Sequence, residues 1–431
     1  MHKHFFALLL AGVGIVLAGV IIAFIVSDQI SVPKPLAVLS SLVKEDDQID
    51  LFGTMLAFQS SKAFAGHKEW ETTAGESWKT FRDSSNYAKF VDALTPALTS
   101  AAELVKETGF SSNRDIVGAF TWNVIETDKG TYDWAIPDAT LAAAGDAGVA
   151  LSAVVQPYAS WDSSYRINPA SCVGIDFVYF DYNGGLPVDE AAYAAWLTTT
   201  VERYDGDGVS DMPGLTTRVE AWEIANEIEG PCGGELAIAA NYVELLKMSH
   251  GIIKAADPTA LVLNAGALEI IGMNGLPIDK TVEFWESFFA LGGAEYVDIL
   301  NVHYNRERYG ISETLDVYEQ HLVFFRDLLN ANGYESTPIW LTEFGTYVGT
   351  PQPQQGPGQS SPAIGTGKTQ TVAVQESWTR RAVAMGVSYG VERFFFDLQG
   401  GDDSAIGASA LFDHRGEARD ILTTLQEIGE E

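Results

Sequence analysis

The feature that most constrains the fold is a regular alternation of short apolar runs with longer segments of helical periodicity, from residue 51 to residue 428. Eight runs have the length and the β-branched or aromatic content of buried strands. They cover residues 51–58, 116–122, 150–156, 219–227, 260–267, 297–303, 339–343 and 393–398. Helical patterns follow at residues 96–108, 137–147, 189–204, 235–256, 280–291, 313–330, in a stretch ending near 385, and at 416–428. Every predicted strand is therefore followed by a predicted helix.

This order predicts parallel strands, because a strand that returns in the same direction needs a helical crossover. Residues 261–263 and 394–396 are apolar throughout, as in strands that are covered on both faces. We therefore predict an α/β fold, specifically a (β/α)8 TIM barrel, and the 431 residues suit one such domain of ~250 or more residues with insertions. An open doubly wound sheet is the alternative, but no Gly-rich phosphate loop follows the first strand.

A separate segment precedes this domain. Residues 5–26 contain no charged side chain and follow Lys3, which is typical of an uncleaved signal-anchor or transmembrane helix. A cleaved signal peptide is the alternative. In either case we expect export, with the uncleaved form bound to the membrane and facing the periplasm or cell exterior. The predicted division is an anchor at 1–27, a linker at 28–48 and the barrel domain at 49–431.

The charge balance excludes one class of partner. The chain has 58 acidic and 26 basic residues, with a formal net charge of −32. A surface this acidic repels phosphate backbones, so we expect no nucleic-acid partner.

The two cysteines, Cys172 and Cys232, follow the third and fourth predicted strands and so are expected at the same end of the barrel. They either pair as a disulfide or remain two inert thiols.

Two glutamates follow or end predicted strands. Asn226 and Glu227 close the fourth strand, and Glu343 closes the seventh. The C-terminal ends of barrel strands form one rim, so both carboxylates are expected to face one cleft. A protonated and an ionised carboxyl on either side of a sugar are what hydrolysis of a glycosidic bond needs. The alternative is that both are structural carboxylates.

At these residues the chain resembles glycoside hydrolase clan A, the retaining (β/α)8 glycosidases. The matching motifs are residues 222–227 (WEIANE) and 340–345 (WLTEFG), and residues 122–134 are similar to the strand-two region of families 5, 39 and 42. The resemblance spans residues 51–425 and does not resolve the family. It implies a retaining β-glycosidase that needs no cofactor, with Glu227 as the acid/base and Glu343 as the nucleophile.

The resemblance also implies substrate contacts. Asn226 would bind the sugar 2-hydroxyl, and His303 would line the site. Many members have a tyrosine two residues after that histidine, where this chain has Asn305, so Tyr304 or another tyrosine would substitute. Many also carry an arginine on strand two, where the predicted strand has residues 118–120 (GAF). If no other residue replaces that arginine, the charge support for Glu343 would be weaker, which keeps a non-catalytic carbohydrate-binding protein as the alternative.

Aromatic and polar residues at the predicted rim are further candidates for sugar contacts. An aromatic ring packs against the apolar face of a pyranose, and Trp161, in a rim loop, is the strongest such candidate. Trp70 and Trp78 are weaker candidates, whereas the strand tryptophans are expected in the core. Asp397 and Gln399 close the eighth strand and are expected near the sugar.

Two loops complete the predictions. Asp205, Asp207 and Asp211 alternate with glycines as in calcium loops, so they predict either a stabilising Ca²⁺ site or a plain Asp/Gly turn. Residues 350–370, rich in Pro, Gly, Gln and Ser, directly follow the Glu343 strand. We interpret them as a wall or lid of the cleft, with a passive loop as the alternative.

Overall fold

The computed structural model describes residues 49–56, 78–115, 118–162, 185–230, 233–272, 276–304, 315–350, 369–401 and 407–430. In these ranges, eight parallel strands form one sheet in the order β5-β4-β3-β2-β1-β8-β7-β6. The strands are β1 (Ile49–Leu56), β2 (Phe110–Asp115), β3 (Ala150–Val155), β4 (Val219–Ile224), β5 (Leu261–Asn264), β6 (Leu300–Tyr304), β7 (Ile339–Phe344) and β8 (Val391–Asp397).

The seam between β5 and β6 closes the sheet into a barrel. Parallel bridges join Leu263 to Ile299 and Ala267 to Val302. The Asn264 side chain completes the seam, because its Oδ1 accepts from the backbone N–H of Asn301 at 2.7 Å and its Nδ2 donates to the Asn301 carbonyl at 2.8 Å. The predicted (β/α)8 barrel is confirmed.

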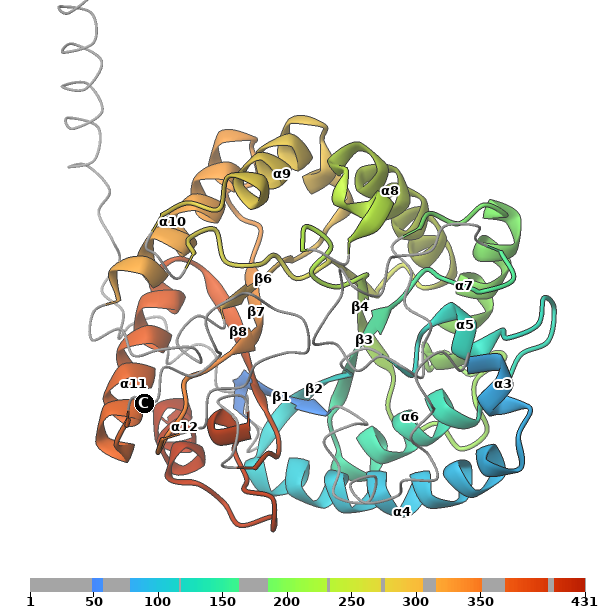
Figure 1. Ribbon diagram of the computed structural model, residues 1–431, viewed down its shortest axis with the longest axis horizontal. Helices are drawn as coiled ribbons and strands as arrows, with labels where there is room; N and C mark the ends of the chain where they lie inside the picture. The colour runs from blue at the N-terminus through green and yellow to red at the C-terminus, as the bar shows by residue number, and fades with distance from the viewer. Residues whose placement is uncertain are drawn as a thin grey trace, which may run out of the picture.

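Helices surround the strands on all sides (Figure 1). The α-helices are α3 (Trp78–Arg82), α4 (Ser85–Thr108), α5 (Trp122–Ile125), α6 (Ala135–Ala147), α7 (Glu190–Tyr204), α8 (Ala239–Ala256), α9 (Asp279–Ala290), α10 (Asp316–Ala331), α11 (Val372–Ser388) and α12 (Asp420–Glu430). Short 3₁₀ turns are η4 (Gly234–Ala237), η5 (Gly293–Tyr296) and η7 (Gly407–Ser409). The apolar faces of the α-helices and the outer faces of the strands form one large core.

The second strand was predicted wrongly at residues 116–122. β2 is Phe110–Asp115, directly after Gly109, whose φ of 74° ends α4. Of the predicted strand, residues 118–121 form a turn and Trp122 begins α5. Phe120 packs outside the barrel, with its ring centroid 5.6 Å from that of Trp222. β2 has the sequence FSSNRD, which does not resemble a buried strand, because it carries Arg114, whose side chain contacts Glu223 of β4.

Apolar side chains fill the middle of the barrel interior. This inner cluster consists of Met55, Ala221, Leu263, Ile299, Trp340 and Phe395. Near the end where the strands begin, Arg393 Nη1 contacts Glu220 Oε1 at 2.6 Å, and its guanidinium lies 4.4 Å from the Trp340 ring centroid. At the opposite end, where the strands finish, Arg114 contacts Glu223 and Glu343.

Several predictions fall outside the described residues. These are the anchor and linker at 1–48, the two cysteines, Trp70, Asn305 and most of the 350–370 segment. Trp78 begins α3, but its side chain is not described. None of the helices in the described part of the chain combines the length and apolarity that a bilayer crossing requires.

Candidate active site

Glu343 lies on strand β7, one residue before the strand ends. Along the β6–β7 pair, Val302 faces Leu341 and His303 faces Glu343, so Thr342 is one residue extra. Such a β-bulge re-aims neighbouring side chains and is common beside active sites. It allows both Thr342 and Glu343 to reach the barrel interior.

Glu227 lies on a strained turn beyond the end of β4. Ala225 has a φ of 65° and Glu227 a φ of 47°, a left-handed conformation that residues with a side chain rarely adopt. Backbone hydrogen bonds fix this turn, from Ala225 N to Val155 O at 2.8 Å and from Gly230 N to Glu227 O at 3.1 Å. Strain of this kind persists only where the surrounding fold enforces it.

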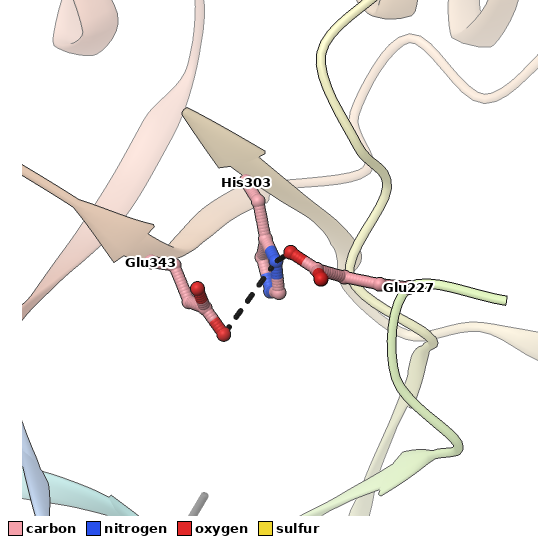
Figure 2. A group of neighbouring side chains, drawn as sticks. All are labelled: Glu227, His303 and Glu343. Atoms are coloured by element: carbon pink, nitrogen blue, oxygen red, sulfur yellow. Dashed lines mark hydrogen bonds and ion pairs between the residues drawn. The ribbon is translucent and has the colours of Figure 1, made fainter. Parts of the chain in front are cut away.

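The two carboxylates meet beside His303 (Figure 2). His303 Nδ1 lies 2.8 Å from Glu227 Oε1 and 3.7 Å from Glu343 Oε1. One oxygen of each carboxylate and a ring nitrogen of the histidine all lie within 4.8 Å of one another. The Glu227 and Glu343 side chains are 30% and 14% exposed, whereas His303 is fully buried. Both carboxylates are therefore reachable from solvent, and the histidine lies beneath them.

Arg114 on β2 supplies the charge that the sequence had suggested was missing. Its Nη1 donates to Glu343 Oε1 at 3.1 Å, and its Nη2 donates to Asn226 Oδ1 at 2.7 Å. Its Nε and Nη2 also contact the two oxygens of Glu223 at 2.7 and 2.8 Å. The sequence comparison found no arginine because it placed the second strand at residues 116–122, downstream of the actual β2. The observation that had favoured a non-catalytic protein is thereby removed.

Burial and neighbouring charges act in opposite directions on the pKa values of Arg114 and His303. Burial disfavours a charged Arg114, but the charge and hydrogen bonds of Glu223, and then those of Glu343, raise its pKa above the ordinary value. Burial likewise disfavours charged His303, yet the charge of Glu343 and the hydrogen bond and charge of Glu227 raise its pKa above the ordinary value.

Glu229 anchors the strained turn to the barrel wall, and the sequence did not single it out. Its Oε1 accepts from Leu268 N at 2.6 Å and from Trp285 Nε1, on α9, at 2.7 Å. Burial, with a smaller contribution from the charge of Glu227, raises the pKa of Glu229 to about 7. In the sequence, only its position two residues after Glu227 indicates that Glu229 could belong to the site.

Of the predicted site residues, Glu227, Glu343, His303 and Asn226 come together, and Tyr304 does not. Adjacent strand residues point to opposite faces, so Tyr304 points outward while His303 points inward. The Tyr304 ring is buried, with its centroid 4.7 Å from that of Tyr318 on α10. The prediction that it contacts the sugar was wrong for this reason.

Trp161 and Asp397 are held by their own contacts. Trp161 Nε1 donates to the Glu126 carbonyl at 2.7 Å, and its ring lies edge-on to Trp122 of α5. Asp397 ends β8 and accepts from Ser409 Oγ at 3.4 Å. Their predicted sugar contacts stay predictions.

Gln399 donates to the Asp413 carbonyl at 3.0 Å and so is engaged with the loop that follows β8. Its predicted sugar contact also stays a prediction.

Asp205, Asp207 and Asp211 lie together between α7 and β4, where β4 begins. Backbone N–H groups already donate to them, from Asp207 to Asp205, from Val209 to Asp207 and from Gly208 to Asp211. These bonds are those of an ordinary Asp/Gly turn, and the Ca²⁺ site stays a prediction.

No protein-family model and no functionally curated protein matches the sequence. Solved structures share its barrel. A family 39 glycoside hydrolase from Bacteroides cellulosilyticus WH2 has a TM-score of 0.54 and 14% identity, over 90% of this chain and 64% of that one. A monomeric β-xylosidase from Caulobacter crescentus CB15 has a TM-score of 0.55 and 14% identity, over 88% and 67%.

An exo-β-1,4-mannosidase from Opitutaceae bacterium strain TAV5 has a TM-score of 0.53 and 15% identity, over 89% of this chain and 59% of its own. This chain thus spans two thirds of the length of these proteins, or slightly less. The likeness establishes the shared fold, on which glycoside hydrolases of several specificities are built.

Proposed function

We propose that this protein is a retaining β-glycoside hydrolase in which Glu343 is the nucleophile and Glu227 the acid/base. One observation carries the proposal: two solvent-accessible carboxylates face each other, one held by a buried arginine and the other by a buried histidine. The two carboxylates thus have different charged neighbours. Such a difference is needed when one carboxyl has to be ionised and the other protonated at the same pH.

The separation of the carboxylates favours retention of configuration. An oxygen of Glu227 and an oxygen of Glu343 lie within 4.8 Å. Retaining enzymes hold their carboxyl groups about 5–5.5 Å apart, whereas inverting enzymes need about 6.5–9.5 Å to admit a water molecule. The inverting alternative would require the two side chains to separate.

In the first step, a Glu343 oxygen attacks the anomeric carbon as the bond to the leaving oxygen breaks. The proton of Glu227 passes to that oxygen, and a glycosyl–Glu343 ester forms. Arg114 keeps Glu343 ionised and fixes its orientation. Because Arg114 also occupies Asn226 Oδ1, the Asn226 amide group turns its Nδ2 donor toward a sugar hydroxyl.

In the second step, Glu227 removes a proton from a water molecule that attacks the anomeric carbon, and Glu343 leaves as a carboxylate. Each inversion at the anomeric carbon reverses the other, so the product keeps the β configuration.

The shared barrel of a family 39 glycoside hydrolase, a β-xylosidase and a β-mannosidase supports this proposal. Because those proteins differ in sugar, the first experiment is a panel: aryl β-xylosides, β-mannosides, β-glucosides and β-galactosides, with xylan, mannan and β-glucan. We expect release of phenol from at least one aryl glycoside, with β configuration in the first-formed sugar by NMR. Binding of a glycan without hydrolysis by the wild-type protein would contradict the proposal.

We also propose that the enzyme is exported and held at the membrane by residues 1–27. The uncharged stretch at 5–26 supports this. Membrane fractionation of the full chain and of a variant lacking residues 1–27 tests it; only the full chain should sediment with membranes.

A further inference from the structure

A chain of hydrogen bonds continues from His303 into the β5–β6 seam, away from the substrate side. His303 Nε2 lies 3.0 Å from Thr342 Oγ1, and Thr342 Oγ1 donates to Asn301 Oδ1 at 2.6 Å. Asn301 Nδ2 in turn donates to the Asn264 carbonyl at 3.2 Å. All four residues are fully buried, so no solvent molecule replaces a partner.

The direction of these hydrogen bonds follows from the chemistry of the groups. A rotated Asn301 amide would set its oxygen against the Asn264 carbonyl, so Oδ1 has to face Thr342 and accept. A hydroxyl has a single hydrogen, and the Thr342 hydrogen is used on Asn301. Thr342 Oγ1 therefore only accepts from His303, which requires a hydrogen on Nε2.

This leaves Nδ1 to face Glu227 at 2.8 Å. A neutral imidazole carries one hydrogen, so an Nε2–H ring has an unprotonated Nδ1. Two groups that both lack a hydrogen repel each other at this distance. We propose that Thr342 and Asn301 fix His303 as the Nε2–H tautomer, so that its Nδ1 and the Glu227 carboxyl share one proton, which Glu227 delivers to the leaving oxygen.

Two further features concern the position of the His303 ring. Thr342 is the extra residue of the β-bulge, which is why its hydroxyl lies under His303 next to Glu343. Gly266 lies against the Nε2 end of the ring, where a Cβ would come within 1.9 Å of Nε2. A larger residue at position 266 would therefore displace the nitrogen that faces Thr342. Thr342 and Asn301 are positioning residues, since they act only through His303.

The charges around His303 favour retention of the shared proton. The titratable or charged groups that face the ring are Glu227, Glu343, Arg114 and, behind β6, His321. The two carboxylates outweigh Arg114, and burial lowers the pKa of His321 to about 3, so that ring adds no charge. The opposite tautomer would donate Nδ1–H to Glu227 and stabilise the carboxylate, which would oppose its role as an acid.

The direct test is ¹⁵N NMR of the full chain with labelled histidine. The chain has seven histidines, and the His303 signals are those lost in His303→Gln. At alkaline pH, where the ring is neutral, we expect the proton on Nε2 in the wild type and in Thr342→Ser, which keeps the hydroxyl. Thr342→Val should populate the Nδ1–H tautomer. A wild-type ring with its proton on Nδ1, or a tautomer unchanged in Thr342→Val, would overturn the proposal.

This NMR result does not require turnover, so it separates the tautomer from the proposed function on which its catalytic role rests. If the enzyme is active, Thr342→Val should lose about tenfold or more in kcat/KM on glycosides with poor leaving groups and about threefold or less on activated aryl glycosides. The alkaline limb of its pH profile should move to lower pH, while Thr342→Ser stays near the wild type. Equal losses on both substrate classes, or equal damage by both substitutions, would show that Thr342 has only a structural role.

Discussion

The two carboxylates differ in the backbone that carries them and in the charged residue that each contacts. Glu343 belongs to strand β7, is paired with His303 of β6 within the sheet, and contacts Arg114, whose charge is permanent. Glu227 lies outside its strand, on a turn with two left-handed residues, and contacts His303, whose charge varies with pH.

This difference matches the chemistry of the two roles. A nucleophile has to remain ionised and to reach one carbon atom, which suits a rigid strand and a fixed positive charge. An acid/base changes its protonation twice in each turnover, which suits a partner that exchanges a proton. The different surroundings of the two carboxylates therefore support the proposed roles independently of any sequence motif.

The largest effect is expected from removal of the nucleophile. Glu343→Gln keeps the shape of the side chain but removes the charge that attacks, so kcat should fall on the order of 10⁴-fold or more. Initial rates on the best aryl glycoside measure this. Glu220→Gln is a matched control, because Glu220 also contacts an arginine inside the barrel but at the opposite end. A comparable loss in the control would mean that the effect is structural.

Removal of the acid should be selective for the substrate. Glu227→Ala is expected to lose about 10²–10⁴-fold on substrates with poor leaving groups and far less on activated aryl glycosides, whose leaving oxygen needs little protonation. A plot of log kcat/KM against leaving-group pKa should therefore be steeper than for the wild type. An unchanged slope would count against Glu227 as the acid.

The positive charge of Arg114 should contribute to the free energy of unfolding as well as to the reaction rate. Arg114→Met leaves the fully buried Glu223 without its counter-charge, which should cost about 3–5 kcal/mol in the free energy of unfolding. Arg393→Met, at the other end of the barrel, breaks a partly exposed pair and should cost less while preserving activity. Denaturant unfolding and rate measurements on both variants test this; similar costs would remove the special role of Arg114.

The smallest effect is expected where the strained turn meets α9. The pKa of Glu229 is about 7 in the folded chain and near 4.5 in an unfolded one, so its neutral form stabilises the fold. That contribution is complete below pH 4.5 and is lost as the pH rises to 7 and beyond. Glu229→Gln keeps the acceptor for Trp285 and should gain on the order of 1–3 kcal/mol relative to the wild type between pH 4.5 and 8.

Asp115 provides the control for this pH dependence, because burial raises its pKa to about 7 at a position on β2. Asp115→Asn should flatten the same stability profile, and only Glu229→Gln should alter the kinetics of the acid step. A Glu229→Gln profile parallel to that of the wild type would contradict the assigned titration.

The barrel and the position of the two glutamates at one rim were predictable because their signals are local. The alternation of strands and helices can be recognised from the consecutive residues of each segment, and each glutamate follows an apolar run that ends at the rim. Arg114 was missed because its strand is polar: the interior of this barrel near the rim is charged, and hydropathy does not register such a strand.

The supporting residues were not predictable, because they act through tertiary contacts. Thr342 owes its position to a bulge that is visible only in strand register, and Glu229 is linked to Trp285, 56 residues later. Tyr304 was misjudged because sequence proximity to His303 was taken as spatial proximity, although neighbouring strand residues face opposite ways.

The most direct test of the two assigned roles is the anomeric configuration of azide adducts. Azide and an activated aryl β-glycoside are supplied to Glu227→Ala and to Glu343→Ala, and the products are identified by NMR. Glu227→Ala should yield the β-glycosyl azide, because azide attacks the glycosyl–Glu343 ester, and Glu343→Ala should yield the α-glycosyl azide, because azide takes the place of the nucleophile. The reverse pairing of variant and configuration would show that the roles of Glu227 and Glu343 are exchanged.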